Sequence, residues 1–140
     1  MEHYKIVLDT NVIVSALRSR RGAGHSIMSA LNSGVFTICI SVPLILEYEE
    51  ILKLKRPVEL FSEEDIEELV DFICSIGRKT LISNLWRPTL RDPDDEMVLE
   101  VAVASKADFI VTYNVKDFVQ ANIFNVKVIT PGQFLKLIRR

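Results

Sequence analysis

Short runs of apolar residues alternate along this chain with amphipathic stretches, and this alternation limits the folds open to it. Near-continuous apolar runs are typical of strands buried on both faces, and the amphipathic stretches between them are typical of covering helices. Strand–helix alternation therefore predicts an α/β fold with a parallel sheet between helices and right-handed crossovers. In such a sheet, ligands bind outside the carboxyl ends of the strands, near the point where the strand order switches.

The individual elements follow from local composition and from start and stop signals. Five segments rich in apolar and β-branched residues are predicted strands: 4–8, 35–40, 80–82, 108–112 and 126–129. The predicted helices are 10–18, a segment after Gly24 to about Asn32, a helix capped by Ser41 to about Lys53, one starting after Ser62, one from Asp92-Pro93 to about Lys106, a short one over 114–120, and a last one over 131–139. Residues 84–91 are predicted to be a loop.

Composition indicates a single globular domain over residues 1–140. The chain is 49% apolar and 26% charged, which is ordinary for a soluble protein. It has no apolar run near the roughly 18 residues of a membrane span and no signal-peptide pattern at its start. We therefore expect a cytoplasmic protein. Cys39 and Cys74 lie in apolar stretches without C-x-x-C spacing, so we expect buried thiols rather than a disulfide or zinc site.

The net charge of −2 argues against a simple nucleic-acid-binding module, because such modules are usually basic. It does not argue against a nuclease. A bound divalent metal supplies positive charge at the place where a phosphate must sit.

Asp9 stands where the first predicted strand ends and the first helix begins. An Asp followed by Thr-Asn could simply cap that helix. It could equally be a ligand at the carboxyl edge of the sheet, so its position alone leaves both interpretations open.

Glu47 lies inside the predicted helix that starts at Ser41. At 100° per residue it falls on the margin of the apolar face, about 100° from Tyr48, where a side chain can reach a cleft at the sheet edge. Glu49 occupies the opposite margin, so helical geometry does not choose between these two acids. A solvated helix glutamate is the more common case.

The densest acidic run is Arg91-Asp92-Pro93-Asp94-Asp95-Glu96. A cap at Asp92 and favourable charge at the helix N-terminus explain Asp92 and Asp94 without any function. Asp95 precedes Val98, Leu99 and Ala102 on the apolar side of this helix, and an inward carboxylate requires a partner such as a metal ion.

Polar residues also follow the predicted strand 108–112, in the segment Thr112-Tyr113-Asn114-Val115-Lys116-Asp117. Asn114 and Asp117 could be turn or cap residues. They are also placed at a strand's carboxyl end, as Asp9 is.

Taken together, these acids predict one metal site. Two strands end in acidic or amide residues, and two helices carry acids that could face the same edge. Hard oxygen ligands without His or Cys favour Mg²⁺ or Mn²⁺ over zinc. Such a site suits phosphodiester cleavage, because a metal can activate water and stabilise the leaving oxygen. Neither a phosphate-binding G-x-x-x-x-G-K-[ST] loop nor a credible context for a His-containing triad competes with this hypothesis.

Over essentially its whole length the sequence resembles the PIN domain family, in particular the PIN-type toxin ribonucleases of toxin–antitoxin pairs. The segments that carry the resemblance are 7–12 (VLDTNV), 46–48 (LEY) with Ile51-Leu52, 91–96 (RDPDDE) and 110–118 (IVTYNVKDF). The resemblance implies a three-layer sandwich with a central parallel five-stranded sheet. It also implies Mg²⁺- or Mn²⁺-dependent cleavage of single-stranded RNA, a homodimer and a possible cognate antitoxin protein.

Matched position by position, the first three acids of the family fall on Asp9, Glu47 and Asp95. This match, not geometry, favours Glu47 over Glu49 and Asp95 over Asp94. The implied catalytic and metal-binding residues are thus Asp9, Glu47 and Asp95.

The fourth family acid falls on Asn114, where this sequence departs from the pattern. Asn114 can bind a metal through its carbonyl oxygen but brings no charge, and Asp117 could compensate. Asn11 and Thr112 resemble the polar residues that orient the first acid or contact the phosphate.

Basic residues near the expected edge complete the hypothesis. Arg18 and Lys116 are candidate contacts to RNA phosphates, together with Arg20 and Arg21. Alternatively, these side chains only keep a loop soluble. Lys53, Lys55 and Arg56 carry less signal.

Two other functions fit parts of the pattern. A receiver-like phosphoacceptor domain would need two adjacent acids after the first strand, whereas only Asp9 stands there, and Ile40-Ser41 supplies no acceptor Asp. A catalytically silent PIN-like binding domain would be consistent with Asn114.

Overall fold

Five parallel strands form one sheet in the order β3-β2-β1-β4-β5. The computed structural model describes residues 3–82 and 92–139. Its strands are β1 (Tyr4–Leu8), β2 (Phe36–Ile40), β3 (Arg78–Lys79), β4 (Phe109–Val111) and β5 (Lys127–Ile129). The predicted α/β class with a central five-stranded parallel sheet is confirmed.

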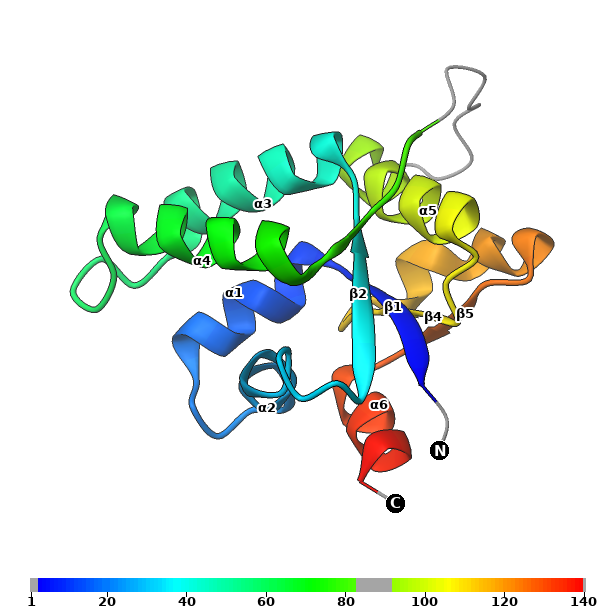
Figure 1. The fold of residues 1–140 in the computed structure, drawn as a ribbon, viewed down its shortest axis with the longest axis horizontal. Coiled ribbons are helices and arrows are strands. Elements are labelled where there is room, and N and C mark those ends of the chain that lie inside the picture. Colours follow the sequence, from blue (N-terminus) through cyan, green and yellow to red (C-terminus); the bar gives the residue numbers. More distant parts are fainter. Residues whose placement is uncertain (1–2, 83–91, 140) are drawn as a thin grey trace.

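Helices cover both faces of this sheet, which makes the three-layer sandwich. They are α1 (Thr10–Arg18), α2 (Ala23–Ser29), α3 (Val42–Lys55), α4 (Glu63–Ile76), α5 (Pro93–Ser105), the 3₁₀ segment η1 (Val115–Phe124) and α6 (Pro131–Ile138). Figure 1 shows α3, α4 and α5 on one side of the sheet, with α1, α2 and α6 on the other. Among the described residues, no helix is long and apolar enough to cross a membrane.

The three central strands, β1, β2 and β4, are apolar because this part of the sheet is buried on both sides. Ile6, Val7 and Leu8 of β1 are buried, as are Ile110 and Val111 of β4. At full burial each such side chain contributes roughly 1.5–3 kcal/mol to folding. The two thiols are free: Cys39 is buried and Cys74 partly buried.

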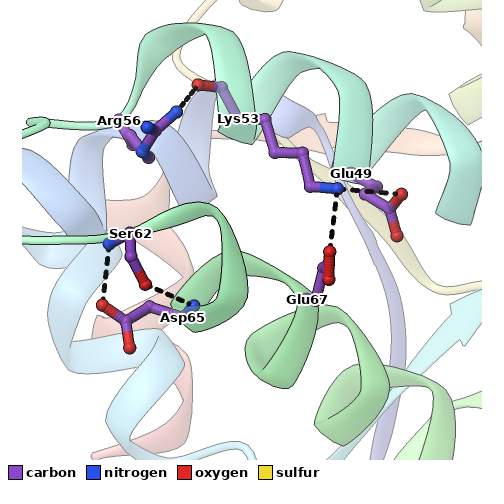
Figure 2. Close-up of polar contacts among 6 residues, drawn as sticks. All are labelled: Glu49, Lys53, Arg56, Ser62, Asp65 and Glu67. Carbon is purple, nitrogen blue, oxygen red and sulfur yellow. Dashed lines mark hydrogen bonds and ion pairs between the residues drawn. The ribbon is translucent and has the colours of Figure 1, made fainter.

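Helix starts agree with the sequence signals. The Ser62 hydroxyl accepts from the Asp65 amide at 3.1 Å, and the Asp65 carboxylate accepts from the Ser62 amide at 2.8 Å (Figure 2). This reciprocal capping box satisfies amides that α4 itself leaves unpaired. Asp92 caps α5 by accepting from the amide of Asp94 at 2.9 Å.

Three boundaries differ from the predictions, and the first is that of the short helix predicted over 114–120, which is the 3₁₀ segment η1 at Val115–Phe124. The strand predicted at 80–82 is β3 at residues 78–79, because pairing with Cys39 and Ile40 of β2 places it there. Helix α2 ends at Ser29 rather than near Asn32. The loop predicted over 84–91 lies outside the described residues.

The strand order puts the topological switch at β1. From β1 the chain moves outward through β2 and β3, then returns to pair β4 with the other side of β1. The helices that follow β1 and β4 therefore leave in different directions. A ligand is expected in the opening between them, at the carboxyl ends of these two strands.

Candidate functional site

A cleft of about 430 Å³ opens at this switch point. It is lined by the first residues after β1, by one face of α3, by the start of α5 and by the segment after β4. Its acidic lining residues are Asp9, Glu47, Asp92, Asp94, Asp95 and Asp117, and Asn11 and Asn114 add amide groups. The structure thus brings the predicted ligands Asp9, Glu47, Asp95, Asn114 and Asp117 to one cleft.

Asp9 is held by a neighbouring strand and not only by its place at a helix start. It is 8% exposed, and the Thr112 hydroxyl donates to its Oδ2 at 2.7 Å. Its side chain makes no capping hydrogen bond to α1, although it stands at the cap position. Burial raises the pKa of Asp9, partly opposed by Thr112 and by the amides of Thr10 and Asn11. The amides of Thr10 and Asn11 belong to the first turn of α1, so this carboxylate is favoured both by the helix start and by Thr112, and helix capping alone does not account for it.

The Thr112 hydroxyl is fully used by three hydrogen bonds. Besides donating to Asp9, its oxygen accepts from the Asn114 amide at 2.9 Å and from Asn11 Nδ2 at 3.3 Å. A hydroxyl has one donor and two acceptor positions, so all are occupied. Thr112 is completely buried and does not line the cleft. Its contacts link the end of β4 to the first acid, which is an orienting arrangement.

A Thr112→Val substitution is expected to destabilise the fold by about 1–3 kcal/mol, because it leaves a buried carboxylate and amide without their partner. Thr112→Ser keeps the hydroxyl and should recover most of that loss. Chemical denaturation of the three proteins checks this expectation. Equal stabilities of the Val variant and the wild type would contradict the role given to this hydroxyl.

The end of β1 is also fixed from α3. The hydroxyl of the fully buried Tyr48 donates to the carbonyl oxygen of Leu8, the residue before Asp9. Burial and the nearby Asp9 carboxylate keep the pKa of Tyr48 well above its usual value, so this donor stays protonated. Tyr48 was not predicted as a site residue, since its position in the sequence matches that of an ordinary core aromatic.

Asp95 is the most perturbed acid of the cleft. Its pKa is raised to about 7, first by burial and then by the charges of Asp9, Asp92, Asp117 and Asp94. Asp117 also raises the pKa of Asp9, so Asp9, Asp95 and Asp117 share one electrostatic neighbourhood. Carboxylates placed this close together favour a cation or bound protons between them.

The structure separates Glu47 from Glu49, which helical geometry could not. Glu47 is 8% exposed and lines the cleft, and its pKa is raised by burial and then by the charges of Asp94, Glu50 and Asp92. Glu49 instead lies 3.5 Å from the Lys53 ammonium on the side of α3 that meets α4 (Figure 2). Of the two margins of α3, the one bearing Glu47 faces the start of α5.

Helix α5 is buried on more sides than its pattern predicts. The sequence places Asp95 inward, yet Glu96 is the more buried residue at 6% exposure, whereas Asp95 is half-buried in the cleft wall. The reason is that α5 packs against β1, β2 and β4 and also against α3 and η1. Asp92 and Asp94, explained above by helix capping, line the cleft as well.

The basic residues predicted to contact RNA phosphates differ in whether they line the cleft. Arg18 lines the cleft, whereas Lys116, Arg20 and Arg21 are exposed and absent from its lining. Lys55, which carried little signal in the sequence, is part of the lining. Its position depends on how α1 packs on α3, which no local pattern encodes.

The donor set suits a hard divalent cation. Every predicted ligand offers oxygen, and burial followed by the charges of neighbouring acids raises the pKa of Asp95. In the described parts of the chain, no group of three acidic side chains is close enough together to hold one metal ion. Mutual repulsion of carboxylates opposes a closer approach when no cation lies between them.

Comparison with known proteins adds the family. A family model described as PIN domain matches residues 5–116, which include the cleft acids Asp9, Glu47 and Asp95, while Asp117 lies one residue beyond the matched range. The chain belongs to the PIN domain family. A comparison with curated protein sequences finds no match.

Among solved structures, this PIN domain is similar to a chain in the crystal structure of VapBC2 from Rickettsia felis bound to a DNA fragment from the promoter. The TM-score is 0.59 at 19% sequence identity, with 90% of this chain and 98% of that chain covered. At this identity the likeness shows a shared fold.

Proposed function

We propose that this PIN domain is a divalent-metal-dependent endoribonuclease that hydrolyses RNA phosphodiester bonds. The observation that carries the proposal is the cleft at the β1–β4 switch point, where Asp9, Asp95 and Asp117 share one electrostatic neighbourhood and Glu47 faces them from α3. Among the described residues, the acids of this cleft have no His or Cys beside them in its lining, and carboxylate oxygens gathered in this way suit a hard divalent cation. The chemistry proposed for the cleft is therefore that of a bound metal.

Asp9, Glu47 and Asp95, aided by Asn114 or Asp117, would hold Mg²⁺ or Mn²⁺. When bound, the ion would activate water for attack on the phosphorus and stabilise charge on the departing oxygen. The protein's part is to fix the ligands. Thr112 orients Asp9 through its 2.7 Å hydrogen bond, and Tyr48 anchors the strand end that carries Asp9.

Asn11 and Arg18 lie on the cleft wall and are proposed to contact the substrate backbone. Thr112 acts behind Asp9, and Lys116 would engage RNA outside the cleft. The raised pKa of Asp95 adds a pH dependence: without metal this carboxyl is half protonated near pH 7, so metal binding should strengthen as the pH rises through 7.

The cellular role that fits best is the toxin of a toxin–antitoxin pair, in which a cognate antitoxin protein restrains a cytoplasmic ribonuclease that forms a homodimer. Two observations support this part of the proposal: the family membership and the fold likeness to a VapBC2 chain. The single-domain organisation over residues 1–140 belongs to the same proposal.

The two glutamates of α3 give a matched test. In Mn²⁺, we expect the wild type to cleave a labelled single-stranded oligoribonucleotide, and EDTA to stop cleavage. Glu47→Gln should lower kcat/KM about 100-fold or more, because it removes a ligand charge from the cleft, which corresponds to roughly 3 kcal/mol of transition-state stabilisation.

Glu49→Gln removes the same charge from the same helix, two residues away, and should keep nearly full activity. Two results would contradict the proposal. One is wild-type protein that fails to cleave in Mn²⁺, which would favour a silent binding domain. The other is equal losses in the two variants.

A further inference from the structure

The acidic cleft also has a basic end, formed by the last residues of two helices. Arg18 ends α1 and Lys55 ends α3, and both line the cleft. The Arg18 guanidinium donates from Nη2 to the carbonyl oxygen of Lys55 at 3.1 Å. This bond holds the two helix ends together and fixes where the guanidinium lies.

Helical spacing connects the acidic and basic ends. On α3 the cleft residues are Glu47, Ile51 and Lys55, spaced four apart on one helix face. On α1 they follow the same rule, from Asn11 through Val14 and Ser15 to Arg18. The cleft is therefore a groove with two helical walls, acidic where the walls begin and basic where they end.

The Arg18 guanidinium, held at the carbonyl oxygen of Lys55, lies at the ends of α1 and α3, away from the acids. At 1.5 Å of rise per residue, Lys55 lies about 12 Å along α3 from Glu47, and Arg18 lies about 12 Å along α1 from the start of that helix. An ion pair requires its charged atoms within roughly 4 Å. A phosphate bound at the guanidinium is thus a different group of the ligand from a phosphate among the acids.

The basic end carries charge that the protein does not neutralise. Within residues 3–82 and 92–139, no carboxylate lies in ion-pair distance of Arg18 or Lys55. The neighbouring Lys53 differs, since Glu49 and Glu67 both contact its ammonium, at 3.5 and 3.3 Å (Figure 2).

Arg56 differs in another way. Its guanidinium donates to the carbonyl oxygens of Lys53 and of Phe61, the latter at 2.8 Å, and so fastens the turn between α3 and α4. Among the basic residues at the end of α3, only Lys55 therefore combines a cleft position with an unpaired charge in the described structure.

We propose that Arg18 and Lys55 form a second phosphate subsite. It binds a phosphate of the RNA substrate other than the one at which the strand is cleaved. The proposal rests on the proposed ribonuclease function and narrows its substrate to RNA that carries at least one further phosphate beside the one that is cleaved. A guanidinium offers five N–H donors, and the bond to Lys55 uses one, so others remain for phosphate oxygens. Because the chain as a whole carries a net charge of −2, attraction of the RNA phosphate backbone depends on local positive charges such as those of Arg18 and Lys55.

A purely structural role for Arg18 predicts something else. An arginine can cap the carbonyls at the end of a helix, and basic residues there interact favourably with the helix dipole. That role would change stability but not the dependence on substrate length. Lys55 therefore gives the cleaner test, because its side chain makes no hydrogen bond within the described structure.

The experiment compares Lys55→Gln with Lys53→Gln on two substrates in Mn²⁺. One substrate is a labelled single-stranded oligoribonucleotide. The other is bis(p-nitrophenyl) phosphate, a diester with a single phosphate. For Lys55→Gln, the fall in kcat/KM should be about ten-fold greater on the oligoribonucleotide than on the small diester, mainly through KM. The slope of log(kcat/KM) against log salt should also shrink by about one.

Lys53→Gln should show neither change. Equal losses of Lys55→Gln on both substrates, or a salt slope like that of the wild type, would overturn the subsite while leaving the ribonuclease function intact. Wild-type protein that cleaves neither substrate in Mn²⁺ would instead overturn the ribonuclease function, and the subsite with it.

Discussion

Replacing Asp9 by Asn is expected to reduce Mn²⁺-dependent RNA cleavage by about 10³-fold or more, because several kcal/mol of transition-state stabilisation depend on the ion that this carboxylate holds. Asn is nearly isosteric, and its amide oxygen can still accept the hydrogen bond that the Thr112 hydroxyl donates. The fold should therefore survive. The measurement is kcat/KM on single-stranded RNA, with thermal unfolding as the control.

Two outcomes of the Asp9→Asn experiment would count against the account. Cleavage at the wild-type rate in a clean preparation would mean that the activity belongs elsewhere. Loss of activity together with loss of the folded state would show that Asp9 acts on structure. Asp71→Asn, at an exposed position of α4 outside the cleft, is the matched control and should leave both activity and stability unchanged.

The second large effect is expected for Asp95→Asn, and it has two opposite parts. Cleavage should fall about 10³-fold, as for Asp9. Metal-free protein should become more stable, because the substitution removes a carboxylate whose charged form is disfavoured first by burial and then by the charges of Asp9, Asp92, Asp117 and Asp94. The side chain is only half-buried, so screening by solvent limits the gain to about 1 kcal/mol, or a few degrees in Tm.

The pH dependence of that gain follows from the pKa of Asp95. In the folded protein the pKa is about 7, above its ordinary value of 3.8. The folded state therefore binds more protons than the unfolded state between these values, and stability falls as the pH rises through this interval. The advantage of Asp95→Asn should be largest above pH 7 and disappear below about pH 4.

Thermal unfolding of both metal-free proteins across this pH range provides the measurement. An Asp95→Asn variant less stable than wild type at pH 8 would contradict the crowding of negative charge. Saturating Mn²⁺ should reverse the order by stabilising only the wild type, because a ligand that binds the native state raises its stability.

The strands and the first acid could be predicted because their signals are local. The runs around Ile6 and Ile110 are apolar on both sides, as buried parallel strands must be, and an acid directly after β1 can only stand at the sheet's carboxyl edge. The start of α5 was equally predictable, since Asp92-Pro93 is a strong helix-start signal.

Features that depend on packing between elements could not be predicted in this way. Which of Glu47 and Glu49 reaches the cleft depends on the helix that packs against each margin of α3. The start of α5 lies beside Glu47, whereas α4, which carries Glu67, lies on the side of Glu49. Lys55 belongs to the cleft only because α1 lies against α3. The two-residue strand β3 exists because β2 offers an edge, not because Arg78 and Lys79 favour extended structure.

Asn114 lies between these cases. It stands at the position where the family places a fourth acid, and the structure puts both Asn114 and Asp117 on the cleft wall. The negative charge of Asp117 raises the pKa of both Asp9 and Asp95, an effect that a neutral amide cannot have. The structure thus favours Asp117 as the source of the additional charge near the first acid.

The central claim is that this cleft binds a divalent metal through Asp9 and its neighbouring acids. Calorimetric titration of Mn²⁺ into wild-type protein and into Asp9→Asn, at pH 8 where Asp95 is mostly ionised, tests it most directly. We expect saturable binding to the wild type, and binding weakened at least ten-fold in the variant. Wild-type protein that shows no binding at millimolar Mn²⁺, or a variant that binds equally well, would contradict it.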